Sequence, residues 1–479
     1  MAQPPNVVLL VFDTMRRDAL GAYGGTAATP NFDSFCREAT VYPNCISPSP
    51  WTIPSHVSLF SGKYPSQHGV HETRDRKVID LVGMPEGVKG KMLAESLKGM
   101  GYQTVGFPAN PMLTAKPGFD RGFDSFSANF KRVVSPEEAA LVKEAVEEGK
   151  SKPRIVWKFV RRGQFGKLLK LYSSQRRISK YRKSFDYPKG KGGNLLLERM
   201  RETKLEPPYF LFANFMENHD PYVDYELDVG NRGPFPSVGA ADLYGYKTIG
   251  EEAMRLIKAG YYASATRADS CFGRLILLLK EKGVYENTLV VVTSDHGQAL
   301  MENGYYGHGT FLHDEILAVP LLVKHPRGIK ASVGEGYQNL VGLPSYILHA
   351  VEGGTDAESL STEVTFAQSF GTQQSPPATA DPEFAKKIAE VRNRVDRPLK
   401  TVSKDGMTLL VDGTSGRIEG LFRGGRRADP KDFPSEVEAM MSELGSLQEA
   451  AVAEEPTSAP LTQEEESTIS ERLRELGYL

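Results

Sequence analysis

Continuous apolar runs separated by helix-like segments recur over the first two thirds of the chain. They lie at residues 7–12 and around Val105, Phe212, Val291 and Leu321. Unbroken apolar runs of strand length are typical of parallel strands that are covered by helices on both faces. The pattern predicts an α/β fold with a mostly parallel central sheet, and such sheets bind ligands beyond the carboxyl ends of their strands.

The pattern changes after about Ala350. A polar stretch rich in Gly, Ser, Thr and Pro leads to GMTLLVDGTSGRIEGLF, which is typical of two short strands around a turn, and a helix is predicted over about 435–447. The segment EAAVAEEPTSAPLTQEEES is acidic and lacks aromatic residues, which favours a flexible linker. We therefore predict a main domain over 1–350, a small antiparallel subdomain over 351–447, an acidic linker over 448–468 and a short C-terminal helix over 469–479.

The segment from Lys152 to Lys191 differs in charge from the rest of the chain. It holds fourteen Lys or Arg and one acid, Asp186, a net charge of +13, interleaved with residues such as Trp157 and Phe159. We interpret it as a basic helical insertion over about 150–192 that packs an apolar stripe on the main domain. The alternative is a basic amphipathic helix in peripheral contact with an anionic membrane.

Composition narrows the class of protein. The 479 residues are 40% hydrophobic and 25% charged with a net charge of -2, proportions typical of a globular protein and not of a disordered chain, a collagen or a coiled coil. Neither a secretory signal nor an apolar run of about 20 residues is evident, so we predict a cytoplasmic protein. We expect no nucleic-acid partner and leave the oligomeric state open. Cys36, Cys45 and Cys271 are interpreted as small apolar side chains.

Polar residues follow the apolar runs where the carboxyl ends of strands would meet. Thr52 stands near the start of a predicted helix, a position where threonine is most often an ordinary N-cap. The other polar residues at these ends are Asp13, His219, Asp295 and His296, followed by His308 between two glycines. Carboxylates together with histidine favour Mn or Zn over Ca or Mg as the metal. Their convergence predicts an active site at this edge of the sheet.

Several motifs in one order carry a resemblance to a known family. They are PNVVLLVFDTMRRDALGAYG, TIPSHVSLFSGKYPSQHGV, TSDHG and GHGTFLHDEILAVPLLV. Together they resemble the sulfatases, which belong to the alkaline phosphatase superfamily. The resemblance implies an alkaline-phosphatase-like three-layer sandwich and a metal-dependent hydrolase of ester bonds, with the small antiparallel subdomain at its C-terminal end.

The departures from the sulfatase pattern bear on the substrate. Sulfatases place Cys or Ser, oxidised to formylglycine, where this chain has Thr52, and an Arg where it has His56. Thr14 replaces the second acid of the family, and Asn110 is the nearest polar residue to its substrate clamp. Threonine cannot become formylglycine, and members of the superfamily with a threonine nucleophile act on phosphoric esters. The chain is thus similar to phosphodiesterases and phosphonate monoester hydrolases.

These comparisons lead to one assignment of roles. We expect one divalent metal to be held by Asp13, Thr52, Asp295 and His296, where it would activate Thr52 as the nucleophile that becomes covalently phosphorylated. His219 and His308 are the candidates for protonating the leaving alkoxide. The substrate-binding candidates are His56, Lys63 and Asn110. The expected activity is that of a hydrolase or a phosphotransferase, and the expected substrate is a small-molecule, lipid-linked or glycan-linked phosphoester.

Three alternatives stay open. A second metal is one, with Glu217, His219, Asp220 and His308 as its candidate ligands. Another is hydrolysis of sulfate esters by an unmodified threonine. The third is a non-catalytic protein that binds anions with the same fold.

Overall fold

The computed structural model describes most of the main domain and of the C-terminal region. The described residues are 4–73, 81, 84–113, 118–127, 160–161, 163–164, 166–170, 172–173, 176, 191–220, 222, 249–326, 332–354, 360–372 and 382–447. Most of the predicted basic insertion, the predicted acidic linker and the predicted C-terminal helix lie outside these residues.

A seven-stranded sheet forms the centre of the molecule, in the strand order β2-β10-β7-β1-β6-β4-β5. β1 pairs in parallel with β6 on one side and with β7 on the other, and β6, β4 and β5 continue the parallel arrangement. The strands are β1 (Asn6–Phe12), β2 (Thr40–Tyr42), β4 (Gln103–Pro108), β5 (Ser125–Phe126), β6 (Tyr209–Phe215), β7 (Thr288–Thr293) and β10 (Leu321–Lys324). The predicted mostly parallel sheet is confirmed.

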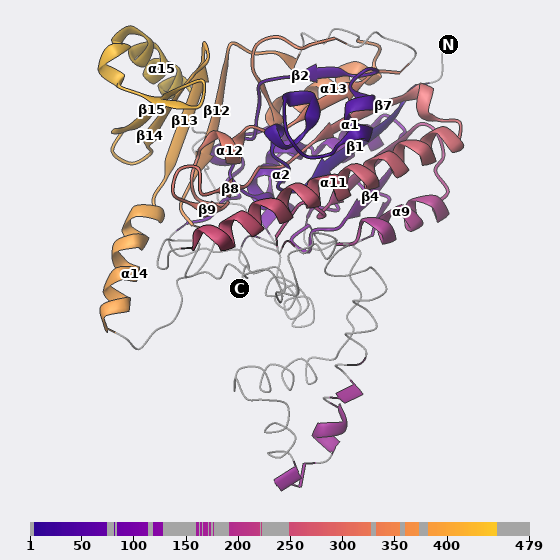
Figure 1. Cartoon of the computed structure of the whole chain (residues 1–479). Coiled ribbons are helices and arrows are strands. Elements are labelled where there is room, and N and C mark those ends of the chain that lie inside the picture. The colour runs from indigo at the N-terminus through magenta and orange to yellow at the C-terminus, as the bar shows by residue number, and fades with distance from the viewer. Residues whose placement is uncertain are drawn as a thin grey trace.

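Helices cover both faces of this sheet and complete three layers. Val7, Leu9 and Val11 of β1 pack on one face, against α2 (Thr52–Ser61), α5 (Leu93–Gly99) and α13 (Leu343–Val351). The alternate residues of β1 pack on the other face, against α1 (Pro30–Phe35), α9 (Gly193–Glu202) and α11 (Glu251–Glu281), and Figure 1 shows α11 lying across the sheet. Because both faces are buried, β1 needs no polar alternation, which explains its unbroken apolar run.

β10 departs from the expected parallel arrangement, because it pairs antiparallel with β7. Leu321 at its start faces Thr293 at the end of β7. The chain between them, with α12 (Asp314–Leu317), β8 (Ala299–Leu300) and β9 (Tyr306–Gly307), makes no helical crossover of the kind that a parallel strand requires. Residues 294–320 therefore stay at the carboxyl end of the sheet, where Asp295 and His308 lie.

The C-terminal region forms a second, five-stranded antiparallel sheet in the order β12-β13-β14-β15-β16. The predicted pair of strands corresponds to β14 and β15, and the predicted helix corresponds to α15, which packs on this sheet (Figure 1). The elements are β12 (Val364–Ser369), β13 (Leu399–Lys404), β14 (Met407–Asp412), β15 (Ile418–Arg423), β16 (Arg426–Ala428), α14 (Pro382–Val395) and α15 (Pro434–Ser446). The remaining short elements are α3 (Pro65–His68) and the pair β3 (Cys45–Ile46) with β11 (Gln338–Asn339).

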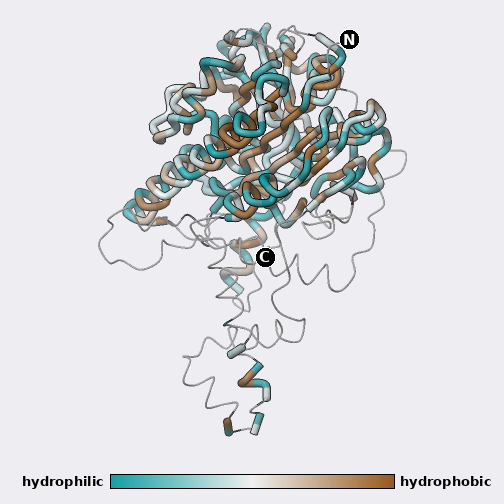
Figure 2. Tube along the Cα trace, turned by 90° about the vertical axis from the view of Figure 1, so that its right-hand side faces the viewer, coloured by the Kyte–Doolittle hydropathy of each residue, from teal (hydrophilic) through white to brown (hydrophobic). Residues whose placement is uncertain are grey.

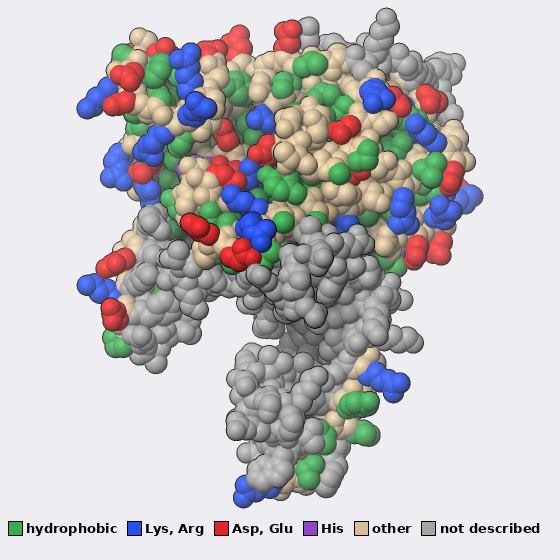
Figure 3. Space-filling view, in the orientation of Figure 1, with side chains coloured by type: hydrophobic (Ala, Val, Ile, Leu, Met, Phe, Trp, Pro, Cys, Tyr) green, Lys and Arg blue, Asp and Glu red, His purple; other side chains and the backbone are tan. Residues whose placement is uncertain are grey.

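Apolar residues concentrate along the central strands, and polar residues dominate the outer turns of the helices (Figure 2). On the face shown in Figure 3, acidic and basic side chains are interspersed. None of the described helices has the length and apolar character that crossing a membrane requires. Cys45 and Cys271 are buried and Cys36 is partly buried, all as free thiols.

Candidate active site

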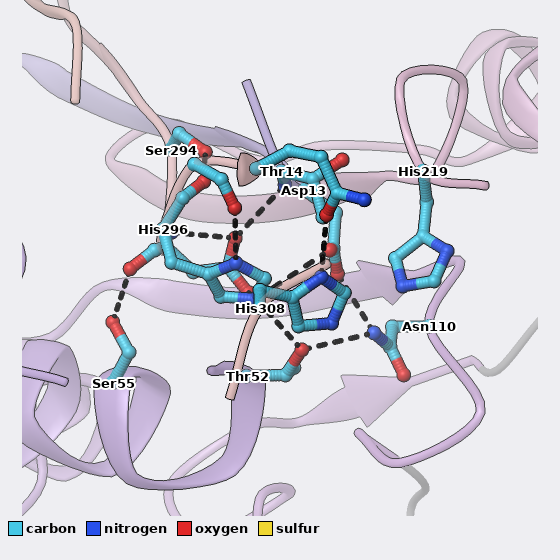
Figure 4. A network of polar contacts seen from close by, with 12 residues as sticks. Asp13, Thr14, Thr52, Ser55, Asn110, His219, Ser294, His296 and His308 are labelled. Atoms are coloured by element: carbon cyan, nitrogen blue, oxygen red, sulfur yellow. Dashed lines mark hydrogen bonds and ion pairs between the residues drawn. The ribbon is translucent and has the colours of Figure 1, made fainter. Parts of the chain in front are cut away.

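The candidate site lies at the carboxyl ends of three adjacent parallel strands (Figure 4). Asp13 follows β1, and Asp295 and His296 follow β7. His219 follows β6, whose last residue, Phe215, faces Phe12 in the strand register. Thr52 begins α2 and enters from the helical layer. The predicted convergence of these residues is therefore what the fold produces.

Asp13, Asp295 and His296 form a buried cluster with one ligand atom each, and these atoms lie within 4.8 Å of one another. His296 donates from Nδ1 to the carbonyl of Gly297 at 2.9 Å, which leaves its Nε2 lone pair 3.4 Å from Asp295 Oδ2. Asp13 Oδ1 and Asp295 Oδ2 are buried without a hydrogen-bond partner among the described residues. Buried oxygens left unpaired beside a neutral imidazole nitrogen fit a divalent cation.

The protonation of this cluster is set by burial. Burial, together with the charge of Asp295, raises the pKa of Asp13 to about 6. Burial raises the pKa of Asp295 to about 7 and lowers the pKa of His296 to about 4. A neutral His296 is the form that ligates metal, and a bound cation would favour the charged form of both carboxylates.

Thr52 lies beside the cluster and contacts it through its hydroxyl. Thr52 Oγ1 is 3.3 Å from His296 Nε2. Asn110 donates from Nδ2 to Asp13 Oδ2 at 2.7 Å, and the same nitrogen is 3.5 Å from Thr52 Oγ1. The helix N-cap is Trp51 and not Thr52, so the Thr52 hydroxyl is not engaged in capping and faces the cluster.

Backbone contacts around Asp295 hold the cluster in place. Thr14 adopts a positive φ of 57°, and its amide points at Asp295 Oδ1 at 3.4 Å. Ser47 and Ser55 both donate to the carbonyl of Asp295. Neither serine is distinguished in the sequence, because a hydroxyl that supports a backbone carbonyl leaves no motif.

His219 and His308 both face the cluster, and their pKa values are shifted in opposite directions. Their ring centroids are 5.2 Å apart, and His308 lies 4.4 Å from His296. Burial lowers the pKa of His219, but the charge of Asp220 and its hydrogen bond to Nδ1 outweigh this and raise the pKa. Burial and the neighbouring His296 lower the pKa of His308, whose Nδ1 donates to Gln298 Oε1 at 2.6 Å. These surroundings thus favour a protonated His219 and a neutral His308.

Of the predicted substrate-binding residues, Asn110 contacts the cluster, whereas His56 and Lys63 donate hydrogen bonds to backbone carbonyls. His56 donates from Nδ1 to the carbonyl of Thr52 at 2.9 Å and lies 3.5 Å from Asp295 Oδ2, while its ring packs among phenylalanines such as Phe60. Burial lowers the pKa of His56 to about 3, so it is neutral. The Lys63 ammonium donates to the carbonyl of Lys89 at 2.8 Å at an exposed position, whereas the cluster is fully buried.

The candidate ligands of a second metal are in part engaged with other groups, although Glu217 Oε2 is buried without a hydrogen-bond partner among the described residues. Glu217 Oε1 accepts from the amide of Gly193 at 2.7 Å, at the start of α9, and Asp220 pairs with His219 at 2.9 Å. Within the described part of the chain, Asp13, Asp295 and His296 are the group that meets the geometric conditions for a metal. A buried lysine, Lys191, contacts Glu217 through its backbone amide at 3.3 Å, and nothing in the surrounding basic sequence distinguishes it.

Comparisons with known proteins agree with this geometry. A family model described as Sulfatase matches residues 5–353. Human N-acetylgalactosamine-6-sulfatase is 26% identical over 328 residues, which cover 65% of this chain and 53% of the human protein, so the chain spans about half the length of that relative. An arylsulfatase of Clostridium perfringens is 24% identical, covering 71% of this chain and 72% of its own.

Solved structures share the fold at low sequence identity. The phosphonate monoester hydrolase of Silicibacter pomeroyi has a TM-score of 0.61 and 16% identity, covering 94% of this chain and 97% of its own. That of Agrobacterium radiobacter has a TM-score of 0.58 and 15% identity, covering 92% and 95%. A putative sulfatase of Bacteroides thetaiotaomicron has a TM-score of 0.60 and 15% identity, covering 95% and 93%.

Proposed function

Because this chain belongs to the sulfatase family, we propose that it is a metal-dependent hydrolase that cleaves phosphate esters with Thr52 as its nucleophile. Phosphodiesters and phosphonate esters are the substrates that we favour. The observation that carries the proposal is the Thr52 hydroxyl, which lies 3.3 Å from His296 Nε2 beside the two unpaired carboxylate oxygens.

The chemistry of threonine favours phosphoryl over sulfuryl transfer. The β-carbon of Thr52 carries a methyl group, so oxidation of the hydroxyl cannot yield the aldehyde that a sulfatase hydrates. A sulfated threonine has no hemiacetal route for expelling sulfate. Phospho-threonine, in contrast, can be attacked by water at phosphorus, so the same residue serves both half-reactions.

A divalent metal, Mn or Zn by its ligands, would be held by Asp13, Thr52, Asp295 and His296, where it would acidify the hydroxyl and neutralise charge on the ester. Asn110, which donates to Asp13 Oδ2 and lies within reach of Thr52 Oγ1, orients the nucleophile.

Two histidines then move the protons. Thr52 Oγ1 forms a bond to phosphorus and passes its proton to neutral His308, while the bond from phosphorus to the alkoxide breaks. Protonated His219 gives its proton to that alkoxide, which leaves as an alcohol. Water then attacks phospho-Thr52 and gives one proton to His219, and the Thr52 oxygen regains its proton from His308 as the enzyme–phosphorus bond breaks. The net reaction consumes one ester and one water.

Sulfate-ester hydrolysis by the unmodified threonine is the second candidate, and the names of the curated relatives favour it. The human and Clostridium perfringens proteins are both named as sulfatases. The two candidates share the site and differ in the atom that Thr52 attacks.

A panel of nitrophenyl esters tests the proposal. The full chain, loaded with Mn or Zn, is assayed with a phosphodiester, a phosphomonoester, a phosphonate monoester and a sulfate ester. We expect turnover of phosphorus esters, its loss in Thr52→Ala with metal binding retained, and partial activity in Thr52→Ser. Thr104→Ala is the control, since this buried hydroxyl donates to the carbonyl of Gly122 away from the cluster. Near-parental activity in Thr52→Ala contradicts the mechanism, and faster hydrolysis of the sulfate ester favours the second candidate.

A further inference from the structure

Lys191 is a buried lysine for which the mechanism above has no use. It is 3% exposed, just before α9, and its backbone amide points at Glu217 Oε1 at 3.3 Å. Its ammonium has no hydrogen-bond partner among the described residues and lies 5.7 Å from the ring centroid of Tyr222. A buried ammonium without a partner is unfavourable, because it has lost its hydration without a replacement.

The contact between the Lys191 amide and Glu217, two residues before His219, places Lys191 on the side of the candidate site. Burial lowers the pKa of Lys191 to about 8, and the charges of Asp220, Glu217 and Asp13 limit that fall. The Lys191 charge in turn opposes the rise in the pKa of His219 that Asp220 causes. The ammonium therefore lies within electrostatic range of both the metal-ligand cluster and the proposed proton donor.

A second buried lysine shows how such a group is satisfied when its role is structural. Lys324, at the end of β10, is 5% exposed. Its ammonium donates to the carbonyls of Tyr285, Glu286 and Thr288 at 2.7, 3.4 and 3.3 Å. Among the described residues, the fold supplies backbone acceptors to the Lys324 ammonium and no hydrogen-bond partner to that of Lys191, which is therefore available to bind an anion.

We propose that Lys191 binds a nonbridging oxygen of the anionic ester substrate at the Asp13–Asp295–His296 cluster. The proposal rests on the proposed function, which places an ester there, and it adds the residue that recognises the negative charge of that ester. An ammonium can donate to a phosphoryl or a sulfuryl oxygen as a compact point charge. Lys191 then stabilises the ester while His219, on the same side, protonates the leaving group.

Binding of inorganic phosphate and inorganic sulfate tests Lys191 separately from turnover. The metal-loaded full chain is titrated with each anion by calorimetry, as the parental protein and as Lys191→Met. We expect phosphate affinity to fall roughly tenfold to a hundredfold, as for the loss of a charge-assisted hydrogen bond, with metal affinity unchanged. Lys324→Met is the matched control. It should lower the thermal midpoint and leave anion affinity within about threefold.

Thermal unfolding of the same variants separates a binding role from a structural one. Removing an unpaired buried charge should leave the thermal midpoint of Lys191→Met equal to or above the parental value. Lys191→Gln, which keeps a donor without the charge, serves in its place if Lys191→Met does not fold, and is expected to weaken phosphate binding as well.

Each outcome decides the proposal. Unchanged anion affinity in the Lys191 variants overturns it, and so does a parental protein that binds neither phosphate nor sulfate. If phosphate binds and depends on Lys191 but no phosphorus ester is turned over, the proposed function fails and the binding role of Lys191 stands.

Discussion

Two groups of acidic residues in this molecule differ in whether the chain supplies partners for their carboxylate oxygens. Asp13 and Asp295, at the carboxyl end of the central sheet, each keep one buried oxygen without a hydrogen-bond partner among the described residues. In the C-terminal sheet, Arg397 contacts Asp412 Oδ2 at 2.6 Å and Glu419 Oε1 at 2.9 Å. Asp412 Oδ1 also accepts from the Ser415 amide at 2.8 Å.

The pKa values move in opposite directions as a result. Burial raises the pKa of Asp13 to about 6 and of Asp295 to about 7. In the C-terminal sheet, burial acts in the same direction on Asp412, but hydrogen bonds from Ser415 and Arg397 outweigh it and lower the pKa to about 2. Arg397 likewise lowers the pKa of Glu419 to about 2. Carboxylates that the chain itself satisfies hold the fold together, whereas unpaired ones are available to a ligand at a cost in stability.

The same substitution in the two regions should therefore have opposite effects, and this is the largest contrast that we expect. Asp295→Asn removes a metal ligand and should lower activity by at least about a hundredfold. In chelator, the same variant should have a higher thermal midpoint than the parental protein, because a buried charge that repels Asp13 is gone. Metal titration, ester assays and thermal unfolding measure these effects.

Asp412→Asn is the matched control, with a lower midpoint and unchanged activity. A lower midpoint for metal-free Asp295→Asn would show that the fold already satisfies this carboxylate.

The pH dependence of stability should also differ in sign between the two regions. In the metal-free folded protein, Asp13 and Asp295 stay protonated at pH values above their ordinary pKa of 3.8, because their pKa values are raised to about 6 and about 7. The folded chain thus binds more protons than the unfolded chain between about pH 4 and 7, and their contribution to the free energy of unfolding falls as pH rises across that window.

Asp412 and Glu419 behave in the opposite way. Their folded pKa values of about 2 lie below the ordinary 3.8 and 4.5, so their stabilisation is present above about pH 4.5 and is lost as pH falls towards 2. Thermal midpoints across this range, for the parental protein, Asp295→Asn and Asp412→Asn in chelator, assign each slope to its region. A slope above pH 4 that is unchanged in Asp295→Asn contradicts the assignment to that carboxylate.

Loss of the Arg397 guanidinium, which pairs with Asp412 and Glu419, should have a moderate effect on stability and none on activity. Arg397→Met leaves Asp412 and Glu419 partly buried without their shared partner, which should cost about 1–3 kcal/mol and lower the thermal midpoint. Ester turnover should be unchanged. Arg255→Met is the control, since its pair with Glu252 is exposed and its loss should leave the thermal midpoint nearly unchanged. Reduced activity at an unchanged midpoint would link this charge group to the site.

The sequence predicted the fold well because buried parallel strands leave an unbroken apolar signal. β1, β4, β6 and β7 all fall on predicted runs. β12 and β13 were not predicted, since their mixed polar composition resembles a loop until β14 pairs with β13. The orientation of β10 was also missed, because apolar composition does not encode strand direction.

The convergence of the polar residues at the strand ends was predictable from the sequence, whereas the residues that surround and support them were not. Asp13, Asp295 and His296 follow strand ends, and a strand end is visible in sequence. Lys191 is one of fourteen basic residues in its segment, and only burial distinguishes it. Lys63 was selected from a motif, but its ammonium donates to an exposed backbone carbonyl.

Lys63 and Lys191 differ in the same way as the two groups of acidic residues, because one has a hydrogen-bond partner within the described chain and the other has none. Lys63 already has an acceptor, the carbonyl of Lys89 at 2.8 Å, whereas the buried Lys191 ammonium has none in the part of the chain that the structure describes. Lys63→Ala should therefore change KM and kcat by no more than about threefold, the size expected for an exposed hydrogen bond. Steady-state assays with the best ester of the panel, run beside Lys191→Met, measure the difference. Equal losses of phosphate affinity in the two variants would mean that Lys63 leaves Lys89 and reaches the bound anion, so that a lysine partnered in the free protein can still serve the site.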